Sequence, residues 1–126
     1  MKHNYLLVLT VLSLLCFAVM SANAQGDLAT RGIIRGAVTD PNGAAVPNAT
    51  VTITGTNGDR VVTTNEEGVY EANNLIPGVY SVRIEQTGFS AVNATNQTVF
   101  VGRATTVNAK LEVGAAGAVV DVTTTN

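Results

Sequence analysis

The sequence predicts an all-β domain built as a two-sheet sandwich. Valine, isoleucine and threonine dominate the chain after its N-terminal apolar run, and glycine recurs at short intervals. No stretch there has the i, i+3, i+4, i+7 apolar spacing of an amphipathic helix. Seven short segments have strand composition and are separated by turn residues, namely 32–40, 49–55, 60–64, 68–71, 79–86, 98–101 and 104–113.

Side-chain alternation predicts the buried face of these segments, because successive residues of a strand point to opposite sides. Segment 79–86 shows it most clearly, with Tyr80, Val82 and Ile84 on one face and Ser81 and Arg83 on the other. The same pattern directs further residues inward: Ile34, Gly36, Val38, Ala49, Val51, Ile53, Val107, Ala109, Leu111 and Val113. The core that we predict comprises Ile34, Val38, Val51, Ile53, Tyr70, Leu75, Tyr80, Val82, Ile84 and Leu111.

The first 24 residues have the features of a cleaved export signal. A basic start at Lys2 precedes an apolar run over residues 5–20, which is too short for a comfortable membrane span. Ala22 and Ala24 then fit the small-residue pattern that signal peptidase accepts, so we predict cleavage between Ala24 and Gln25.

Two alternatives to cleavage at Ala24 are weaker. An uncleaved membrane anchor is disfavoured because polar residues follow at once without a basic stop-transfer cluster. Lipoprotein processing at Cys16 is disfavoured because Leu15 stands where a small residue is expected and the apolar run continues beyond it.

Removal of the leader sets the composition of the exported chain. It takes away Cys16 and His3, the only cysteine and the only histidine, so a single domain must fold by apolar burial without disulfides. Lys2 also leaves, so six basic residues remain against nine acidic ones, and no basic patch favours nucleic acid as a partner. We expect a flexible N-terminus over 25–31, the sandwich over 32–113 and a flexible tail over 114–126, in which 119–123 is able to add a strand.

Residues 40–48 are predicted to form a stiff connector. Pro41 presets φ near about −65°, and Asn42 and Gly43 tolerate the positive φ that a turn requires next. Pro47 then pushes Val46 toward extended geometry ahead of the next strand. A ligand-binding loop is the alternative interpretation of this segment.

Three ordered stretches within residues 33–113 are more specific than composition: IRGAVTDPNGAAVPNATVTITGTNG, TTNEEGVYEANNLIPGVYSVRIEQTGF and VGRATTVNAKLEV. Their most distinctive elements are the turn leading to Val46-Pro47, the Gly68-Val69-Tyr70 step, the Leu75-Ile76-Pro77-Gly78 corner and the Thr87-Gly88-Phe89 turn. Together they resemble a carboxypeptidase regulatory-like domain. The resemblance implies a transthyretin-like or immunoglobulin-like sandwich of about seven strands, in a superfamily that also holds carbohydrate-binding-like modules.

Catalysis is not expected from this set of residues. A zinc carboxypeptidase needs histidine ligands and a serine triad needs a base, and the exported chain has no histidine and no cysteine nucleophile. The resemblance is therefore to the accessory module beside such enzymes. Glu66 and Glu67 are adjacent in a predicted turn and would diverge instead of sharing a substrate. We expect no enzyme, no cofactor and no metal site.

Weaker alternatives involve turn and strand residues. Calcium binding would use Asp40, Asn42, Asp59, Asn65 and Glu66, which lack the dense spacing of a dedicated loop. Tyr70 and Tyr80 are interpreted as packing residues whose hydroxyls reach the backbone, with sugar stacking as the alternative.

An intramolecular isopeptide bond of the kind in related adhesins is disfavoured, because the first strand offers Arg35 and the sole exported lysine is Lys110. Three glycosylation triplets, which begin at Asn48, Asn93 and Asn96, are common in threonine-rich chains.

Residues 111–123 resemble the segment that links such a domain to the plug of certain TonB-dependent outer-membrane receptors. The sequence is thus compatible with a stand-alone exported module or with a receptor N-terminus, in the periplasm, at the outer membrane or outside the cell. We expect a non-catalytic module for protein interaction or structural support, whose partner is a protein or another cell-envelope component. A carbohydrate-binding module is the alternative, although low aromatic content and the absence of tryptophan weigh against it. No membrane span is expected after signal cleavage.

Overall fold

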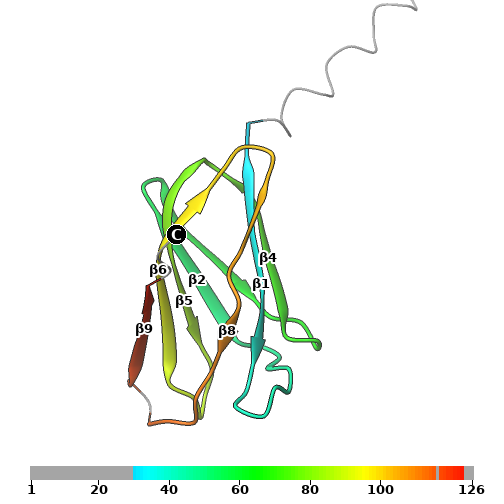
Figure 1. Cartoon of the computed structure of the whole chain (residues 1–126), viewed down its shortest axis with the longest axis vertical. Coiled ribbons are helices and arrows are strands. Elements are labelled where there is room, and N and C mark those ends of the chain that lie inside the picture. Colours follow the sequence, from blue (N-terminus) through cyan, green and yellow to red (C-terminus); the bar gives the residue numbers. More distant parts are fainter. Residues whose placement is uncertain (1–29, 116, 124–126) are drawn as a thin grey trace, which may run out of the picture.

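The computed structural model describes residues 30–115 and 117–123, which form nine strands in two facing sheets (Figure 1). The predicted cleavage site between Ala24 and Gln25 lies outside these residues. The strands are β1 (Gly32–Thr39), β2 (Thr50–Gly55), β3 (Gly58–Thr63), β4 (Val69–Leu75), β5 (Gly78–Glu85), β6 (Ala91–Val99), β7 (Ala104–Thr106), β8 (Ala109–Lys110) and β9 (Val119–Thr123).

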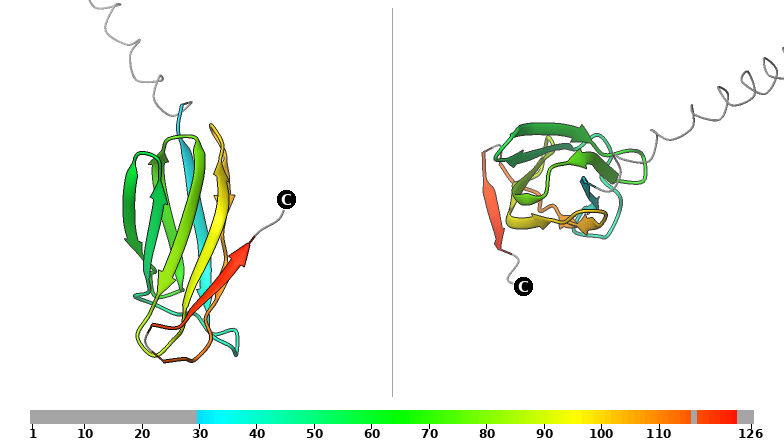
Figure 2. Two further views of the ribbon diagram at one scale, coloured as in Figure 1. Left: turned by 90° about the vertical axis from the view of Figure 1, so that its left-hand side faces the viewer. Right: turned by 90° about the horizontal axis from the view of Figure 1, so that it is seen from above.

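One sheet has the order β4-β1-β7, with β8 also paired to β1, and the other has the order β3-β2-β5-β6-β9. Pairing is antiparallel except for β1 with β7, β1 with β8, and β6 with β9. The end-on view in Figure 2 shows the two layers, with β9 in red at the outer edge of its sheet. The fold class predicted from the sequence, an all-β sandwich, is confirmed.

Because the strands run along the long axis, the connections gather at two ends. We call the end where the described chain begins the proximal end; it holds Arg31 and the turns 55–58, 75–78 and 99–104. The distal end holds the connections 39–50, 63–69, 85–91 and 110–119. In Figure 1 the proximal end is at the top.

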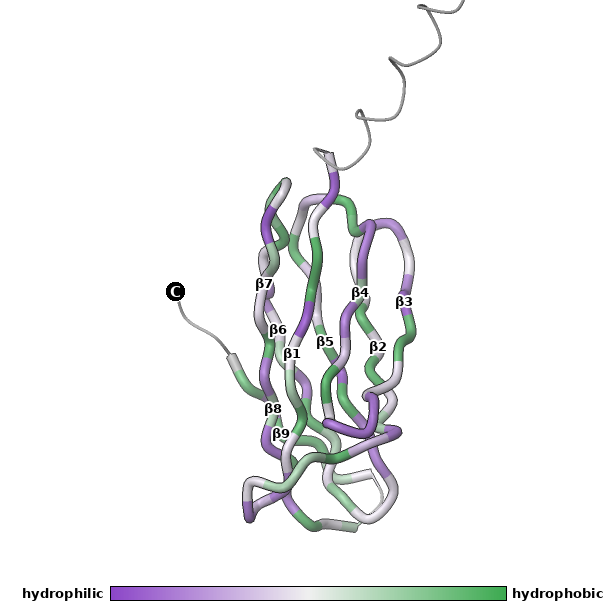
Figure 3. The backbone as a smooth tube through the Cα atoms, turned by 90° about the vertical axis from the view of Figure 1, so that its right-hand side faces the viewer, coloured by the Kyte–Doolittle hydropathy of each residue, from purple (hydrophilic) through white to green (hydrophobic). Residues whose placement is uncertain are grey.

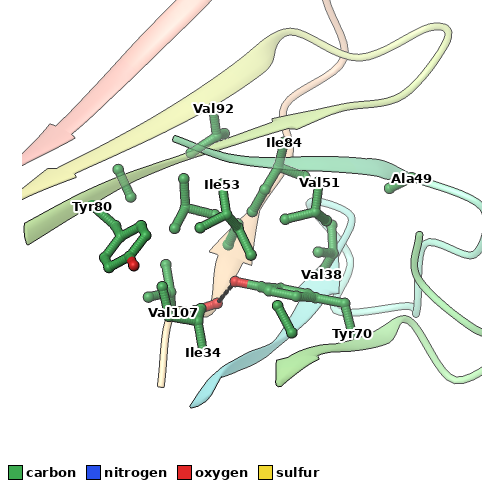
Figure 4. Packing of buried hydrophobic residues seen from close by; sticks show 14 of the residues in the cluster. Ile34, Val38, Ala49, Val51, Ile53, Tyr70, Tyr80, Ile84, Val92 and Val107 are labelled. Atoms are coloured by element: carbon green, nitrogen blue, oxygen red, sulfur yellow. Dashed lines mark hydrogen bonds between the residues drawn. The ribbon is translucent and has the colours of Figure 1, made fainter. Parts of the chain in front are cut away.

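Apolar side chains from both sheets meet in one interior (Figure 4). Hydrophobic and hydrophilic residues alternate along several strands, as Figure 3 shows, so each sheet has one apolar face. The ten residues named above as the core lie in this interior, each with 7% exposure or less. Eight side chains are essentially inaccessible: Ile34, Ile53, Ile84, Leu111, Val38, Val51, Val82 and Val99.

Several predicted strand limits are wrong, and the reasons are local. The sequence pattern missed most of β6, placing a strand at 98–101, whereas Gly102 has a φ of 65° and residues 101–102 form a turn. The predicted strand 104–113 is divided into β7 and β8, because the Asn108 side chain, through Oδ1, accepts the Ala37 N–H at 2.9 Å in place of a backbone partner. Val113, predicted inward, is 77% exposed and forms only an isolated bridge with Phe89.

Two further details concern the β4–β5 corner, where the structure differs from the prediction, and the tail, where the added strand is present. Ile76, expected to point toward the core with Leu75, is 39% exposed because the chain turns at Pro77-Gly78 immediately after it. In the tail, residues 119–123 form β9, which pairs with β6 from Ala91 to Thr95.

Gly36 allows the backbone of β1 to lie close to the backbone at Val107, between β7 and β8. A Cβ at this position would overlap the carbonyl group of Val107 and lie 3.0 Å from the Tyr70 ring. The Val107 N–H donates to the Arg35 carbonyl at 2.8 Å, so the backbone there cannot move away without losing a hydrogen bond.

We therefore expect Gly36→Ala to destabilise the domain by about 3 kcal/mol, the upper part of the range for overpacked interiors. Urea unfolding monitored by circular dichroism measures this loss. The matched control is Gly43→Asn in the exposed distal turn, where φ is 84° and an added Cβ would meet no atom within 4 Å. Asparagine tolerates positive φ better than most residues, so a loss within about 0.5 kcal/mol is expected for this control. Equal losses in the two variants would contradict the steric account.

Candidate functional site

Polar side chains in the two main distal turns stabilise those turns. Asp40 Oδ1 accepts the N–H groups of Asn42 and Ala44, both at 2.8 Å. Asn65 Oδ1 accepts those of Glu67 and Val69 in the same i+2, i+4 pattern. Such side-chain caps replace backbone partners in a tight turn. Residues 40–48 connect β1 to β2, as predicted, and Oδ1 of Asp40 and of Asn65 already has a structural role.

The residues considered for calcium do not converge. Asp40 and Asn65 lie in separate turns at the distal end, whereas Asp59 lies at the proximal end. Glu66 and Glu67 are both exposed in the turn closed by the Gly68 N–H and the Asn65 carbonyl. Among residues 30–115 and 117–123, no three His, Cys, Asp or Glu side chains gather closely enough to hold a metal ion.

Both tyrosines of the described chain are packing residues. The Tyr70 hydroxyl donates to the Val107 carbonyl at 2.6 Å, the dashed line in Figure 4, and the Tyr80 hydroxyl donates to the Ile76 carbonyl at 2.6 Å. Burial raises the pKa of the Tyr70 phenol well above its usual range. Neither ring presents a free face to a sugar, since both residues are buried.

Exposed aromatic surface is scarce. Phe89 is partly buried against the core, and Phe100 is 48% exposed at the proximal end. The Arg103 guanidinium lies 5.2 Å from the centroid of the Phe100 ring, within cation–π range. One face of the most exposed aromatic ring among the described residues is therefore already occupied by a cation.

The hollows on the surface of the described chain include three at different places in the fold. The proximal hollow, about 180 Å³, is lined by Arg31, Asn57, Asp59, Arg60 and Asn74 among others. A groove of about 300 Å³ runs between β6 and β9 on one side and the β7–β8 segment on the other, with Val120 and Val122 on its wall. The third, about 310 Å³, lies at the distal end beside Arg83 and Phe89.

The free strand edges are the second kind of exposed feature. β3 and β9 are the two outer strands of the larger sheet. Val61 of β3 and Val119, Val120 and Val122 of β9 are exposed, and the Asn93 side chain donates to Asp121 at 3.1 Å across the β6–β9 pair. Unpaired strand edges are templates for adding a strand from another chain.

The remaining sequence candidates occupy ordinary strand and turn positions. Lys110 is exposed in β8 beside Thr39, and Arg35 stands opposite Glu71 on the neighbouring strand. Asn48 and Asn96, which begin two of the glycosylation triplets, have positive φ values of 58° and 59°. Across the part of the chain that the structure describes, no helix is long and apolar enough to cross a membrane.

The family model for the carboxypeptidase regulatory-like domain matches residues 33–112. The chain belongs to this family. The match spans β1 to β8 and includes the turn, corner and tyrosine elements that the sequence singled out. A comparison with curated protein sequences gave no match.

Solved structures with the same fold come from proteins of several kinds. The TIE protein of Bacillus anthracis has a TM-score of 0.58 at 23% identity, covering 67% of this chain and 17% of that one. A candidate carbohydrate-binding protein from Bacteroides uniformis has 0.53 at 19%, covering 63% and 40%. The minor pilin GBS52 of Streptococcus agalactiae has 0.54 at 13%, covering 71% and 47%. At these identities the likeness is one of fold, and the chain spans less than half of each of these proteins.

Sequence reasoning missed the proximal hollow. Its residues come from the segment just before β1, from the β2–β3 turn with the start of β3, and from around the β4–β5 corner, so Arg31 and Arg60 are far apart in the chain. Judged along the sequence, the basic residues are spread evenly and form no patch. Only the strand pairing, which brings these turns to one end, reveals that they lie together.

The buried phenol of Tyr70 leads to a prediction about the stability of the domain at alkaline pH. An unfolded tyrosine ionises near about pH 10, whereas folded Tyr70 keeps its proton to higher pH. Tyr70 thus contributes stability that is fully present below about pH 10 and is lost as the pH rises further. In Tyr70→Phe this alkaline loss should be smaller than in the wild type, although loss of the hydrogen bond lowers neutral stability by about 1 kcal/mol.

Urea unfolding between neutral pH and about pH 11 tests this prediction. Tyr80→Phe is the matched control, because it also removes a tyrosine-to-backbone hydrogen bond but leaves Tyr70 in place. It measures how much neutral stability the loss of one such hydrogen bond costs. The explanation fails if Tyr70→Phe keeps the full alkaline slope of the wild type.

Proposed function

We propose that the chain is a non-catalytic exported β-sandwich module that binds or supports another component of the cell envelope. The observation that favours this role is that polar side chains of the turns are hydrogen-bonded within the domain, whereas apolar side chains are exposed at its surface. The best-placed polar groups of the turns, Asp40 and Asn65, are engaged by backbone N–H groups. Apolar side chains are instead exposed at strand edges, notably Val61 and Val120. Surfaces of this kind suit contact with a macromolecule better than turnover of a substrate.

A more specific form of the proposal is the N-terminal accessory domain of a TonB-dependent receptor. The resemblance of residues 111–123 to the segment that precedes a receptor plug supports it. The pairing of β9 with β6 is consistent with such a role, because a strand held in the sheet would fix the direction in which the chain leaves the sandwich. In this setting the domain would lie in the periplasm next to the outer membrane.

Carbohydrate binding is the second candidate function. The structural likeness to a candidate carbohydrate-binding protein favours it, and Asn57 and Asn74 supply amide groups beside the proximal hollow. The cation over the ring of Phe100 weighs against it, because sugar sites usually rely on an open aromatic face. We therefore rank the interaction module first.

Site-specific photo-crosslinking in exporting bacteria tests the interaction module. A crosslinkable amino acid at Val120, on the free edge strand β9, should yield a covalent adduct with a cell-envelope protein. The same group at Arg35, on the outer face of the central strand β1, is the control and should give little adduct. Adducts at both positions alike, or at neither, would count against edge-mediated docking.

Two assays on the protein purified from these cells complete the test. Sequencing of its amino-terminus should begin at Gln25, and retention of residues 1–24 would refute the predicted cleavage. Passage over immobilised polysaccharides should give no specific retention. Specific retention that a free oligosaccharide competes away would establish the carbohydrate-binding alternative instead.

A further inference from the structure

The two ends of the sandwich differ in charge. Arg31, Arg60 and Arg103 lie at the proximal end, where the described chain has a single acidic side chain, Asp59. The distal end is acidic. Its connections and the adjoining strand ends contain five acidic residues, Asp40, Glu66, Glu67, Glu85 and Glu112. They contain two basic residues, Lys110 and Arg83, of which Arg83 is paired with Glu85 at 2.8 Å. A small net negative charge therefore conceals a separation of charge along the long axis.

Apolar side chains are exposed at the same basic end. Ile76 lies in the β4–β5 corner, Val79 is the second residue of β5, and Phe100 and Val101 lie in the β6–β7 connection. Val79 is 57% exposed, and the other three are between 39% and 49% exposed. These residues come from the β4–β5 corner, the start of β5 and the β6–β7 connection, and the pairing of Gly78 with Val99 places the corner beside that connection.

The arginines at this end have unused hydrogen-bonding capacity. Arg31 makes no side-chain hydrogen bond or ion pair with any described residue, and Arg60 uses Nη1 to donate to the Asn73 carbonyl at 3.2 Å. Both line the proximal hollow of about 180 Å³ without forming an ion pair with Asp59. Guanidinium groups with free N–H donors are suited to bind phosphate oxygens.

We propose that the proximal end binds the surface of an anionic phospholipid membrane. In this arrangement Arg31 and Arg60 contact headgroup phosphates, while Ile76, Phe100 and Val101 enter the boundary between headgroups and acyl chains. Arg103 lies against Phe100 and would keep its cation at headgroup level when the ring enters, as amphipathic side chains do at interfaces.

A lipid surface explains this combination better than an acidic protein would. A stable protein interface needs a continuous complementary area, typically about 800 Å² on each partner, with a closely packed centre. The proximal end offers a few partly exposed apolar side chains flanked by cations, which can enter a fluid interface without a matching surface opposite them.

Binding of this kind should be reversible and sensitive to salt. Each basic residue near an anionic membrane surface strengthens binding by about fivefold, and the interaction falls off within a Debye length. Three arginines and a few partly inserted side chains give peripheral attachment, so no spanning segment is required.

Sedimentation with lipid vesicles tests the proposal on the protein purified from exporting cells. The probes are vesicles of phosphatidylcholine alone and vesicles of equal amounts of phosphatidylcholine and phosphatidylglycerol. We expect binding to the anionic vesicles, weaker binding at high salt, and little binding to the neutral vesicles. Arg31→Gln and Arg60→Gln should each weaken binding by about fivefold, and Val101→Ser should also weaken it.

Matched variants at the acidic end are the controls. Lys110→Gln removes an exposed distal cation, and Val113→Ser removes a distal valine that is more exposed than Val101. Both should bind the anionic vesicles as the wild type does, and thermal unfolding would verify that all five variants are folded. Equal binding to the two kinds of vesicle, binding to neither, or equal effects of proximal and distal variants would overturn the proposal.

Two competition measurements separate the lipid surface from other anions. Inorganic phosphate should displace no more protein from the vesicles than a neutral salt of the same ionic strength does. A larger displacement by phosphate would indicate a site for the free phosphate ion. Poly-glutamate should compete only weakly. If it binds as tightly as the anionic vesicles and the same arginine variants weaken it equally, the partner is an acidic protein and the lipid assignment is wrong.

Discussion

The structure depends on the dry packing of one sheet against the other. Residues 30–126 contain no cysteine, so no disulfide can hold the layers together. Eight inaccessible aliphatic side chains, drawn from both sheets, instead fill the space between them. Burying such side chains contributes roughly 1.5–3 kcal/mol each before the entropy of folding is subtracted. Even small changes in the separation of the layers would therefore lower the free energy of unfolding.

Close packing also requires that buried polar groups find partners. Thr64 shows how this is done at the distal end, where its hydroxyl accepts the Ala49 N–H at 2.9 Å and donates to the Val46 carbonyl at 2.7 Å. Among the described side chains, no buried nitrogen or oxygen atom lacks a hydrogen-bond partner. The polar residues inside the domain are consequently structural, and the proposed recognition surfaces are the strand edges and the two ends.

Much of the fold could be predicted from the side-chain patterns of individual strands. The alternation in β1, β2 and β5 is strict, and each of these strands is central enough for one face to be covered completely. β6 lacks that signal, because its asparagines, threonines and glutamine have low contrast with its short apolar residues and Asn96 interrupts it with a positive φ. Its place between β5 and β9 comes from tertiary pairing, which overrides weak strand propensity. The grouping of Arg31, Arg60 and Arg103 could not be predicted from the sequence for a related reason, since the start of β1, the β2–β3 hairpin and the β6–β7 connection meet only in the folded domain.

Native-state hydrogen exchange, resolved by residue, tests most directly whether the two sheets form one core. The slowest amides of β1, in the smaller sheet, and of β2 and β5, in the larger one, should exchange only through global unfolding and report the same free energy. Amides of β9, an outer strand with exposed valines, should open at lower cost. A clearly lower opening free energy throughout the smaller sheet would contradict a single shared core, because that sheet would then unfold while the larger one remained intact.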